Sequence, residues 1–171
     1  VARLLRQGDQ VVGISRSLTP GISGLLRKFK STFYFLECDI SDKVQLSKSI
    51  AESISILSVI DYAIANAGIR SRCSIQESSL DLYSKVFDIN TLSQVHLTKC
   101  LVQHSVACNT SLKLLYITSI VGVRGFSDLS TYACSKSALE GFVRSLAVEY
   151  ARHNILVNCV APGFIKSSYY K

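Results

Sequence analysis

Tyr132 and Lys136 lie four residues apart near the start of a predicted helix, a spacing that places both side chains on one helix face. A tyrosine hydroxyl ordinarily has a pKa of about 10 and is a poor acid at neutral pH. A lysine ammonium beside it stabilises the phenolate and makes the phenol a usable acid. Ser119, thirteen residues before Tyr132, ends a predicted strand and offers a hydroxyl to a substrate oxygen. Together these residues predict proton transfer to or from a substrate oxygen, although a Tyr-x-x-x-Lys pair also occurs by chance in many helices.

Along the chain, short apolar runs alternate with segments whose apolar residues have helical spacing. These elements must position the residues above. Short apolar runs predict five strands, at 10–15, 33–38, 59–65, 112–118 and 155–161. Helical spacing of apolar residues predicts helices at 1–7, 22–29, 41–57, 80–107 (continuous or broken near Asp88) and 131–152. Because helices and strands alternate and the strand runs are apolar throughout, we expect a single α/β domain over 1–171, a parallel sheet between two helical layers.

Ligands of such sheets bind outside the carboxyl ends of the strands. The residues at the predicted strand exits are Ser15, Arg16, Asp39, Asn66 to Gly68, Ser119 and 162–167. The candidate catalytic hydroxyl therefore falls at the sheet edge where a ligand is expected.

The motifs at these strand exits resemble those of the short-chain dehydrogenase/reductase family over nearly the whole chain. The matching features are Asn66-Ala67-Gly68 after a strand, Asn90 in the next helix, Ser119, the Tyr132 to Lys136 segment and Pro162-Gly163-Phe164-Ile165. Segments 116–125 (YITSIVGVRG) and 157–165 (VNCVAPGFI) most resemble the 3-oxoacyl-[acyl-carrier-protein] reductases, and sugar and steroid dehydrogenases share them. The resemblance implies a Rossmann-like, doubly wound sheet.

This resemblance implies four catalytic roles. Tyr132 would protonate the carbonyl oxygen during reduction, and Lys136 would assist it and hold the nicotinamide ribose. Ser119 would orient the carbonyl, and Asn90 would hold a water that links Lys136 to solvent. The cofactor would supply the hydride, whereas the protein supplies placement and the proton.

Cofactor binding is implied for a larger set of residues. They are Ser15, Arg16, Asp39, Ile40, Asn66, Ala67, Gly68, Tyr132, Lys136, Pro162, Gly163 and Ile165. Asp39 would contact the adenine, the segment from Asn66 to Gly68 would line the cofactor cleft, and the backbone of Ile165 would meet the nicotinamide carboxamide.

The end of the strand at 10–15 bears on the choice of cofactor. NAD-preferring members of the family usually carry Asp or Glu at this point, to accept a hydrogen bond from the ribose 2′-hydroxyl. This chain has Ser15-Arg16-Ser17 instead, and a guanidinium flanked by hydroxyls can bind a 2′-phosphate. We therefore predict NADP(H) rather than NAD(H). The alternative is that Arg16 is a solvated loop residue.

Each of the other residues also has a purely structural interpretation. Asn66 and Gly68 could simply turn the chain after a strand, and Asp39 could belong to the turn before a helix cap at Ser41 or Asp42. Ser119 could be an ordinary hydroxyl at a strand end, and Asn90 could bond to backbone within its helix. Such accidents would have to coincide at five strand exits, which favours the functional interpretation.

The family's glycine-rich phosphate loop is not found in this sequence. Residues 21–24 (GISG) do not replace it, because they follow Thr-Pro and lack the strand–turn–helix setting. We expect the chain to be a fragment that lacks the first strand with its loop, and also the last strand with the substrate-covering segment. Lys166-Ser167 stands where the family usually has an acidic or polar residue and Thr.

Composition and residue spacing bear on four further features: a nucleic-acid partner, a membrane span, disulfides and a metal site. The net charge is +7, but the basic residues are scattered, the densest group being Arg27, Lys28 and Lys30, so we expect no nucleic-acid partner. No apolar run reaches the roughly 18 residues of a membrane span. The six cysteines form no CxxC pair, which favours buried, reduced thiols in a cytoplasmic protein. His96, Cys100 and His104 have metal-ligand spacing, but without a fourth ligand we expect no metal.

These observations predict an oxidoreductase that reduces a carbonyl to an alcohol, with 3-oxoacyl thioester reduction in fatty-acid synthesis as one candidate reaction. The alternatives are an alcohol, sugar or steroid dehydrogenase of the same family, or a non-catalytic dinucleotide-binding protein or inactive fragment. The expected partners are a small-molecule or acyl-thioester carbonyl substrate and, for the intact protein, further copies of itself in a homodimer or homotetramer.

Overall fold

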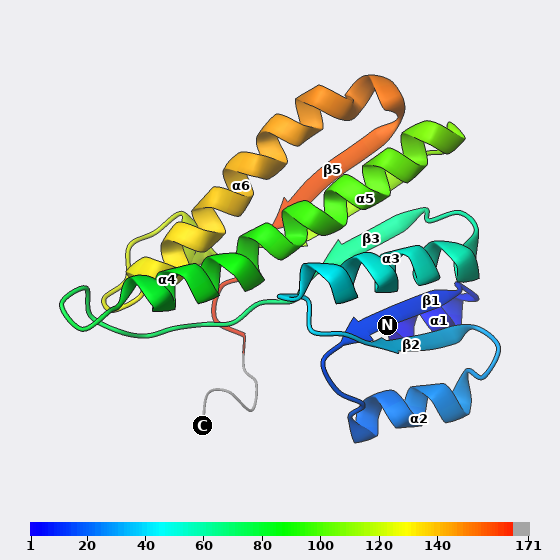
Figure 1. Ribbon diagram of the computed structural model, residues 1–171, viewed down its shortest axis with the longest axis horizontal. Coiled ribbons are helices and arrows are strands. Elements are labelled where there is room, and N and C mark those ends of the chain that lie inside the picture. Colours follow the sequence, from blue (N-terminus) through cyan, green and yellow to red (C-terminus); the bar gives the residue numbers. More distant parts are fainter. Residues whose placement is uncertain (166–171) are drawn as a thin grey trace. The chain divides into compact units, whose positions relative to one another are not determined.

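A computed structural model describes residues 1–165 of the chain, which form two compact units. The first unit comprises Val1–Val59, and the second begins at Ile60. Each unit contains parallel strands and helices (Figure 1).

The first unit contains two strands and three helices. Its elements are α1 (Ala2–Gln7), β1 (Val11–Ser15), α2 (Pro20–Lys28), β2 (Phe33–Glu37) and α3 (Lys43–Leu57). Strands β1 and β2 pair in parallel, with Ser15 opposite Glu37. The carboxyl ends of both strands therefore lie at the same edge of the sheet.

Local sequence explains where the helices of the first unit begin and end. Gly8 follows α1 with a φ of 94°, a left-handed conformation that glycine adopts at little cost. The side chain of Asp42 caps α3 by accepting hydrogen bonds from the backbone of Val44 and Gln45. The predicted start of α2 was wrong: the helix begins at Pro20 and not at residue 22, because proline is tolerated in the first turn and Thr19 caps the helix.

The second unit contains a three-stranded parallel sheet in the order β3-β4-β5. Its elements are β3 (Tyr62–Ala65), α4 (Leu80–Phe87), η1 (Asp88–Leu92), α5 (Ser93–Cys108), β4 (Leu112–Ile117), η2 (Ile120–Gly122), α6 (Ser130–Tyr150), η3 (Ala151–His153) and β5 (Ile155–Val160). Strand β3 starts later than predicted, because Ser58 has a left-handed φ of 61° and Val59 bonds back to Leu57.

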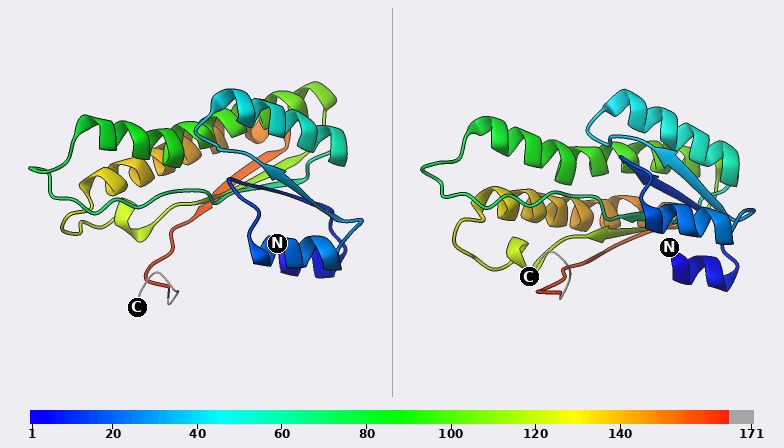
Figure 2. Two further views of the ribbon diagram at one scale, coloured as in Figure 1. Left: turned by 60° about the horizontal axis from the view of Figure 1, so that its bottom comes forward. Right: turned by 90° about the horizontal axis from the view of Figure 1, so that it is seen from below.

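Helices α5 and α6 pack on the same face of this sheet (Figure 2). The buried Tyr116 of β4 contacts both of them, because its hydroxyl bonds to Thr98 of α5 and its ring packs edge-on against Phe142 of α6. Alternate strand residues on the other face, such as Tyr62 and Leu156, are more than half exposed within the described chain. The core of this unit therefore lies between its sheet and these two helices.

The helical segment from Leu80 to Cys108 is continuous but changes its winding. The segment η1 is a π-helix between the α-helices α4 and α5. Single π-turns of this kind are rare and frequently occur at functional sites. Asn90 lies in the middle of η1.

The cysteines are all free, but only Cys38 is fully buried. Cys108, Cys134 and Cys159 are exposed, so the expectation of buried thiols was wrong for these three. Cys134 lies on the solvent-exposed side of α6, and Cys159 lies near the end of β5, on the same face as the buried Ile155 and Val157 but itself exposed. Within residues 1–165, no helix is both long and apolar enough to cross a membrane.

Candidate active site

Lys136 lies in the second turn of α6 and is only 4% exposed. Its Nζ donates a hydrogen bond of 2.8 Å to the carbonyl oxygen of Ile117, at the end of β4. The same Nζ lies 5.9 Å from the centroid of the Tyr132 ring. Burial lowers the pKa of Lys136 to about 8, because desolvation disfavours the ammonium form. At neutral pH the group is therefore still a cation, held beside a phenol.

Asn90 is fully buried in η1 and connects three parts of the second unit. Its Oδ1 accepts a hydrogen bond of 2.7 Å from the backbone N–H of Ile69, and its Nδ2 donates to the Ile69 carbonyl at 2.9 Å. The second Nδ2 hydrogen reaches Ser135 Oγ at 3.0 Å, and Ser135 in turn donates to the Tyr132 carbonyl. Asn90 thus fixes the segment after β3 against the turn of α6 that carries Tyr132.

Gly68 lies where the segment after β3 passes the buried side chains of Asn90 and Lys136. A Cβ at this position would lie 3.1 Å from Asn90 Oδ1 and 3.5 Å from Lys136 Nζ. Its backbone has no left-handed φ, so the residue is needed for close approach and not for a tight turn. Asn66, Ala67 and Gly68 are exposed at the end of β3, and the Ala67 carbonyl accepts a hydrogen bond from Gln94.

Ser119 and Tyr132 line the same pocket, which has a volume of about 220 Å³. The Ser119 Oγ accepts a hydrogen bond of 3.2 Å from the N–H of Val121 and so caps η2. A hydroxyl that accepts in this way keeps its own proton free to be donated to a ligand. The capping role and a role toward a substrate are therefore compatible.

The segment after β5 forms part of the same pocket. Pro162, Gly163 and Phe164 line it, and the Pro162 carbonyl accepts a hydrogen bond of 3.0 Å from the Ile120 N–H. Ile165 lies just beyond and is largely exposed. Lys166 and Ser167, singled out in the sequence, lie outside the described residues.

The candidate residues of the first unit gather at the carboxyl ends of β1 and β2. The Ser15 carbonyl accepts a hydrogen bond from the Cys38 N–H, and Asp39 Oδ1 accepts from the backbone and the hydroxyl of Ser41. These bonds, with a smaller contribution from the Arg16 charge, lower the pKa of Asp39. Asp39 therefore has the structural role of organising the turn before α3, and Ile40 beside it is half-buried.

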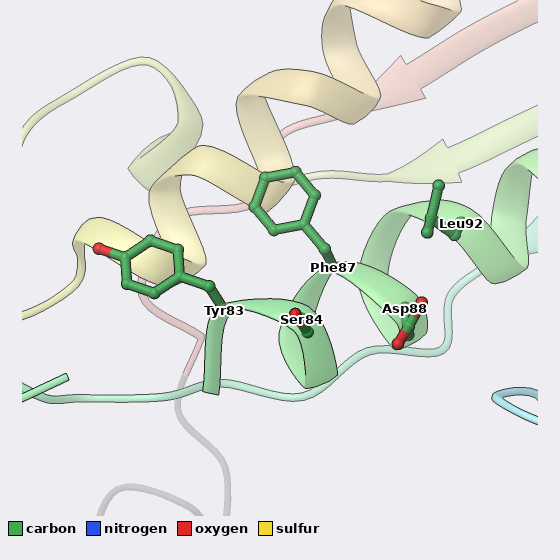
Figure 3. Close-up of a pocket in the computed structure, with 5 residues that line it drawn as sticks. All are labelled: Tyr83, Ser84, Phe87, Asp88 and Leu92. Atoms are coloured by element: carbon green, nitrogen blue, oxygen red, sulfur yellow. The ribbon is translucent and has the colours of Figure 1, made fainter. Parts of the chain in front are cut away.

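A larger hollow of about 340 Å³ lies elsewhere in the second unit, along α4 and η1. Figure 3 shows its five side chains, with the rings of Tyr83 and Phe87 extending toward α6. None of the sequence-predicted site residues lines it. The smaller pocket is the candidate active site, because both Ser119 and Tyr132 line it.

Sequence reasoning missed several groups that build this site. Ser135 is fully buried and bridges Asn90 to the backbone of Tyr132, and Arg70 lines the pocket. A polar residue three positions after Tyr132, on the same helix face, is the signal that points to Ser135. The carbonyl of Ile117, which holds Lys136, gives no signal in the sequence.

A parallel α/β architecture with a Ser, Tyr and Lys constellation at its strand ends defines a class of oxidoreductases. The family model described as short chain dehydrogenase matches residues 1–171. The chain belongs to the short-chain dehydrogenase family.

Similar proteins include enzymes that are named for different substrates. The 3-oxoacyl-[acyl-carrier-protein] reductase FabG of Rickettsia conorii is 32% identical over 98% of this chain and 67% of its own length. The 2-dehydro-3-deoxy-D-gluconate 5-dehydrogenase of Pseudoalteromonas atlantica is 32% identical over 95% of this chain and 65% of its own. The solved structure of ElxO with NADP bound superposes with a TM-score of 0.89 at 26% identity, over 98% of this chain and 68% of that one. The chain thus spans about two thirds of each.

Proposed function

We propose that the protein is an NADP(H)-dependent reductase that converts a carbonyl compound to an alcohol. One observation carries the proposal: Ser119 and Tyr132 line a single pocket, and the buried Lys136 cation lies 5.9 Å from the Tyr132 ring. These are the donors that a carbonyl oxygen needs as it gains negative charge.

In the proposed reaction, Ser119 donates a hydrogen bond to the carbonyl oxygen and sets its direction. Tyr132 gives its proton to the same oxygen as the alcohol forms, and the Lys136 ammonium stabilises the phenolate that remains. The nicotinamide group, when bound, supplies the hydride to the carbonyl carbon. Asn90 keeps Tyr132 and the segment at Gly68 in register through its hydrogen bonds to Ser135 and Ile69.

The residues after β3 fit a dinucleotide, because Asn66, Ala67 and Gly68 are exposed while Gly68 leaves open the space beside Lys136 that a Cβ would fill. Lys136 and the backbone of Pro162, Gly163 and Ile165 would hold the nicotinamide end. Ser15, Arg16, Asp39 and Ile40 would hold the adenosine end. Arg16 lies where NAD-preferring members of the family usually carry a carboxylate, which would repel a 2′-phosphate. Its positive charge therefore favours NADP(H), and the NADP-bound structure of ElxO is in keeping with this.

For the substrate, the Rickettsia relative's name favours a 3-oxoacyl thioester of fatty-acid synthesis. The Pseudoalteromonas relative's name favours a sugar-derived substrate, so a dehydrogenase of sugars, steroids or other alcohols is the second candidate. We further propose that the protein is cytoplasmic and acts as a homodimer or homotetramer.

The test is a substrate screen of the full-length protein with NADPH and NADH, followed by absorbance at the nicotinamide band. Acetoacetyl thioesters, sugars and steroids form the three arms. Turnover in one arm that is lost in Tyr132→Phe supports the proposal. Binding of cofactor without turnover in any arm would favour a non-catalytic dinucleotide-binding protein.

A further inference from the structure

The pocket that Ser119 and Tyr132 line contains one charged side chain, Arg70. No Asp or Glu is among its lining residues within the described chain. Arg70 directly follows Ile69, whose N–H and C=O both bond to the buried Asn90. The backbone that carries the guanidinium is therefore anchored to the same residue that positions Tyr132.

The remaining walls of this pocket are largely apolar. They are formed by Ile117, Ile120, Val121, Leu129 and Phe164, with Phe164 packed edge-on against Phe126 at a centroid distance of 5.9 Å. Arg70 itself is exposed, and the apolar walls beside it remove part of the water from a ligand bound there, which strengthens an ion pair. A guanidinium in such a setting suits a carboxylate or phosphate, which it can bind through two parallel hydrogen bonds.

An ion pair joins two charged residues of the neighbouring loops, Arg72 and Asp128. Asp128 lies 3.8 Å from Nε of Arg72, and its backbone carbonyl accepts a hydrogen bond from the Cys73 N–H. Arg124, on the loop between β4 and α6, is exposed and adds a further positive charge to this region. The local charge balance thus favours an anionic ligand.

We propose that Arg70 selects carbonyl substrates that carry a carboxylate or phosphate group. This inference rests on the proposed reductase function and narrows its substrate class. Tyr132 still supplies the proton, while Arg70 holds the anionic end of the substrate. Because it binds a part of the substrate that does not react, its loss raises KM more than it lowers kcat.

The experiment compares matched substrates in the full-length protein. Acetoacetate, 4-oxopentanoate and 5-oxohexanoate are each paired with their methyl ester, and dihydroxyacetone phosphate is paired with dihydroxyacetone. The three keto acids place the carboxylate at increasing distances from the carbonyl, so that the series covers different spans between the reacting carbonyl and Arg70. The dihydroxyacetone pair separates recognition of a phosphate from recognition of a carboxylate. We expect at least one anionic member to exceed its neutral partner in kcat/KM by about tenfold or more, as for a hydrogen bond to a charged group.

Arg70→Gln should remove this preference, and Arg70→Lys should keep part of it by retaining the charge. Arg72→Gln is the matched control, because it removes an equal charge from a side chain that pairs with Asp128. Rising salt should also reduce the preference of the natural protein.

Three results would overturn the role of Arg70. They are equal use of neutral and anionic members by the natural protein, an unchanged ratio in Arg70→Gln, and a rise in cofactor KM that affects both members alike. In each case the reductase function itself stands. Failure of every carbonyl probe to be reduced would instead overturn the reductase function, and the assignment of Arg70 with it.

Discussion

The Tyr132 side chain shares its pocket with Ser119 and lies beside a cation that the fold has buried. Tyr132→Phe removes the hydroxyl proton but little of the binding surface. We expect kcat to fall by about 100- to 10,000-fold while cofactor affinity is kept, as for loss of a general acid. Steady-state kinetics with cofactor titration would measure both. Tyr83→Phe is the matched control, because Tyr83 is absent from this pocket, and an undiminished kcat in Tyr132→Phe would contradict the assignment.

Lys136 places a cation inside the core at a cost in stability. Its pKa is about 8 in the folded chain and 10.5 ordinarily, so the folded state disfavours the charged form by about 3 kcal/mol. This penalty is present in full below pH 8 and declines as the pH rises toward 10.5, because the unfolded state then binds more protons. Lys136→Met should therefore stabilise the protein at pH 7 while abolishing turnover.

Urea unfolding at several pH values checks this expectation. The stability advantage of Lys136→Met over the natural protein should shrink by about 1 kcal/mol between pH 8 and 9. Lys99→Met, at an exposed position of α5, should show no such trend. A pH-independent advantage would mean that packing, and not charge burial, accounts for the difference.

Arg16 is exposed at the carboxyl end of β1. If it binds a 2′-phosphate, Arg16→Ala should lower the preference for NADPH over NADH by roughly one to two orders of magnitude in kcat/KM. Arg27→Ala, which removes an exposed arginine from α2, should leave the ratio unchanged. A natural protein that prefers NADH would refute the role given to Arg16.

At the scale of elements, the winding of the helical segment around Asn90 depends on buried amide hydrogen bonds. Asn90→Ala would leave the N–H and C=O of Ile69 and the Ser135 hydroxyl without these partners. We expect a loss of roughly 2 to 4 kcal/mol in the free energy of unfolding, from unsatisfied buried groups. Asn158→Ala, at an exposed position of β5, should change it by less than about 0.5 kcal/mol. Equal stabilities of the two variants would show that η1 does not need the Asn90 side chain.

Sequence periodicity predicted every α-helix and strand of the described chain, because long amphipathic helices and short apolar strands have distinct repeats. It did not predict the π-turn at Asn90. The Asn90 side chain in this turn bonds to Ile69 and Ser135, which lie 21 and 45 residues away along the chain. Local periodicity carries no signal for such contacts. The residues of the candidate site were predictable in type and place, whereas the backbone groups that hold them, such as the Ile117 carbonyl, were not.

At the scale of the whole molecule, the helices that carry the site leave large apolar side chains uncovered. Leu80, Leu92 and Val148 are exposed on α4, η1 and α6, and Val148 is 82% exposed. The hollow lined by Tyr83, Phe87 and Leu92 lies on the same helical segment. Exposed apolar side chains on neighbouring helices favour an interaction surface, and a stable interface needs roughly 800 Å² from each partner.

We therefore predict that the full-length protein is a homodimer or homotetramer assembled through α4, α5 and α6. Val148→Arg should weaken the assembly, because a buried guanidinium without a partner opposes association. Val44→Arg is the matched control, since Val44 is 64% exposed but lies on α3 in the first unit. Light scattering coupled to size exclusion at micromolar concentration would give the mass of each variant. A natural protein that is monomeric under these conditions, or an assembly that Val148→Arg leaves intact while Val44→Arg disrupts it, would show that these helices are not the interface.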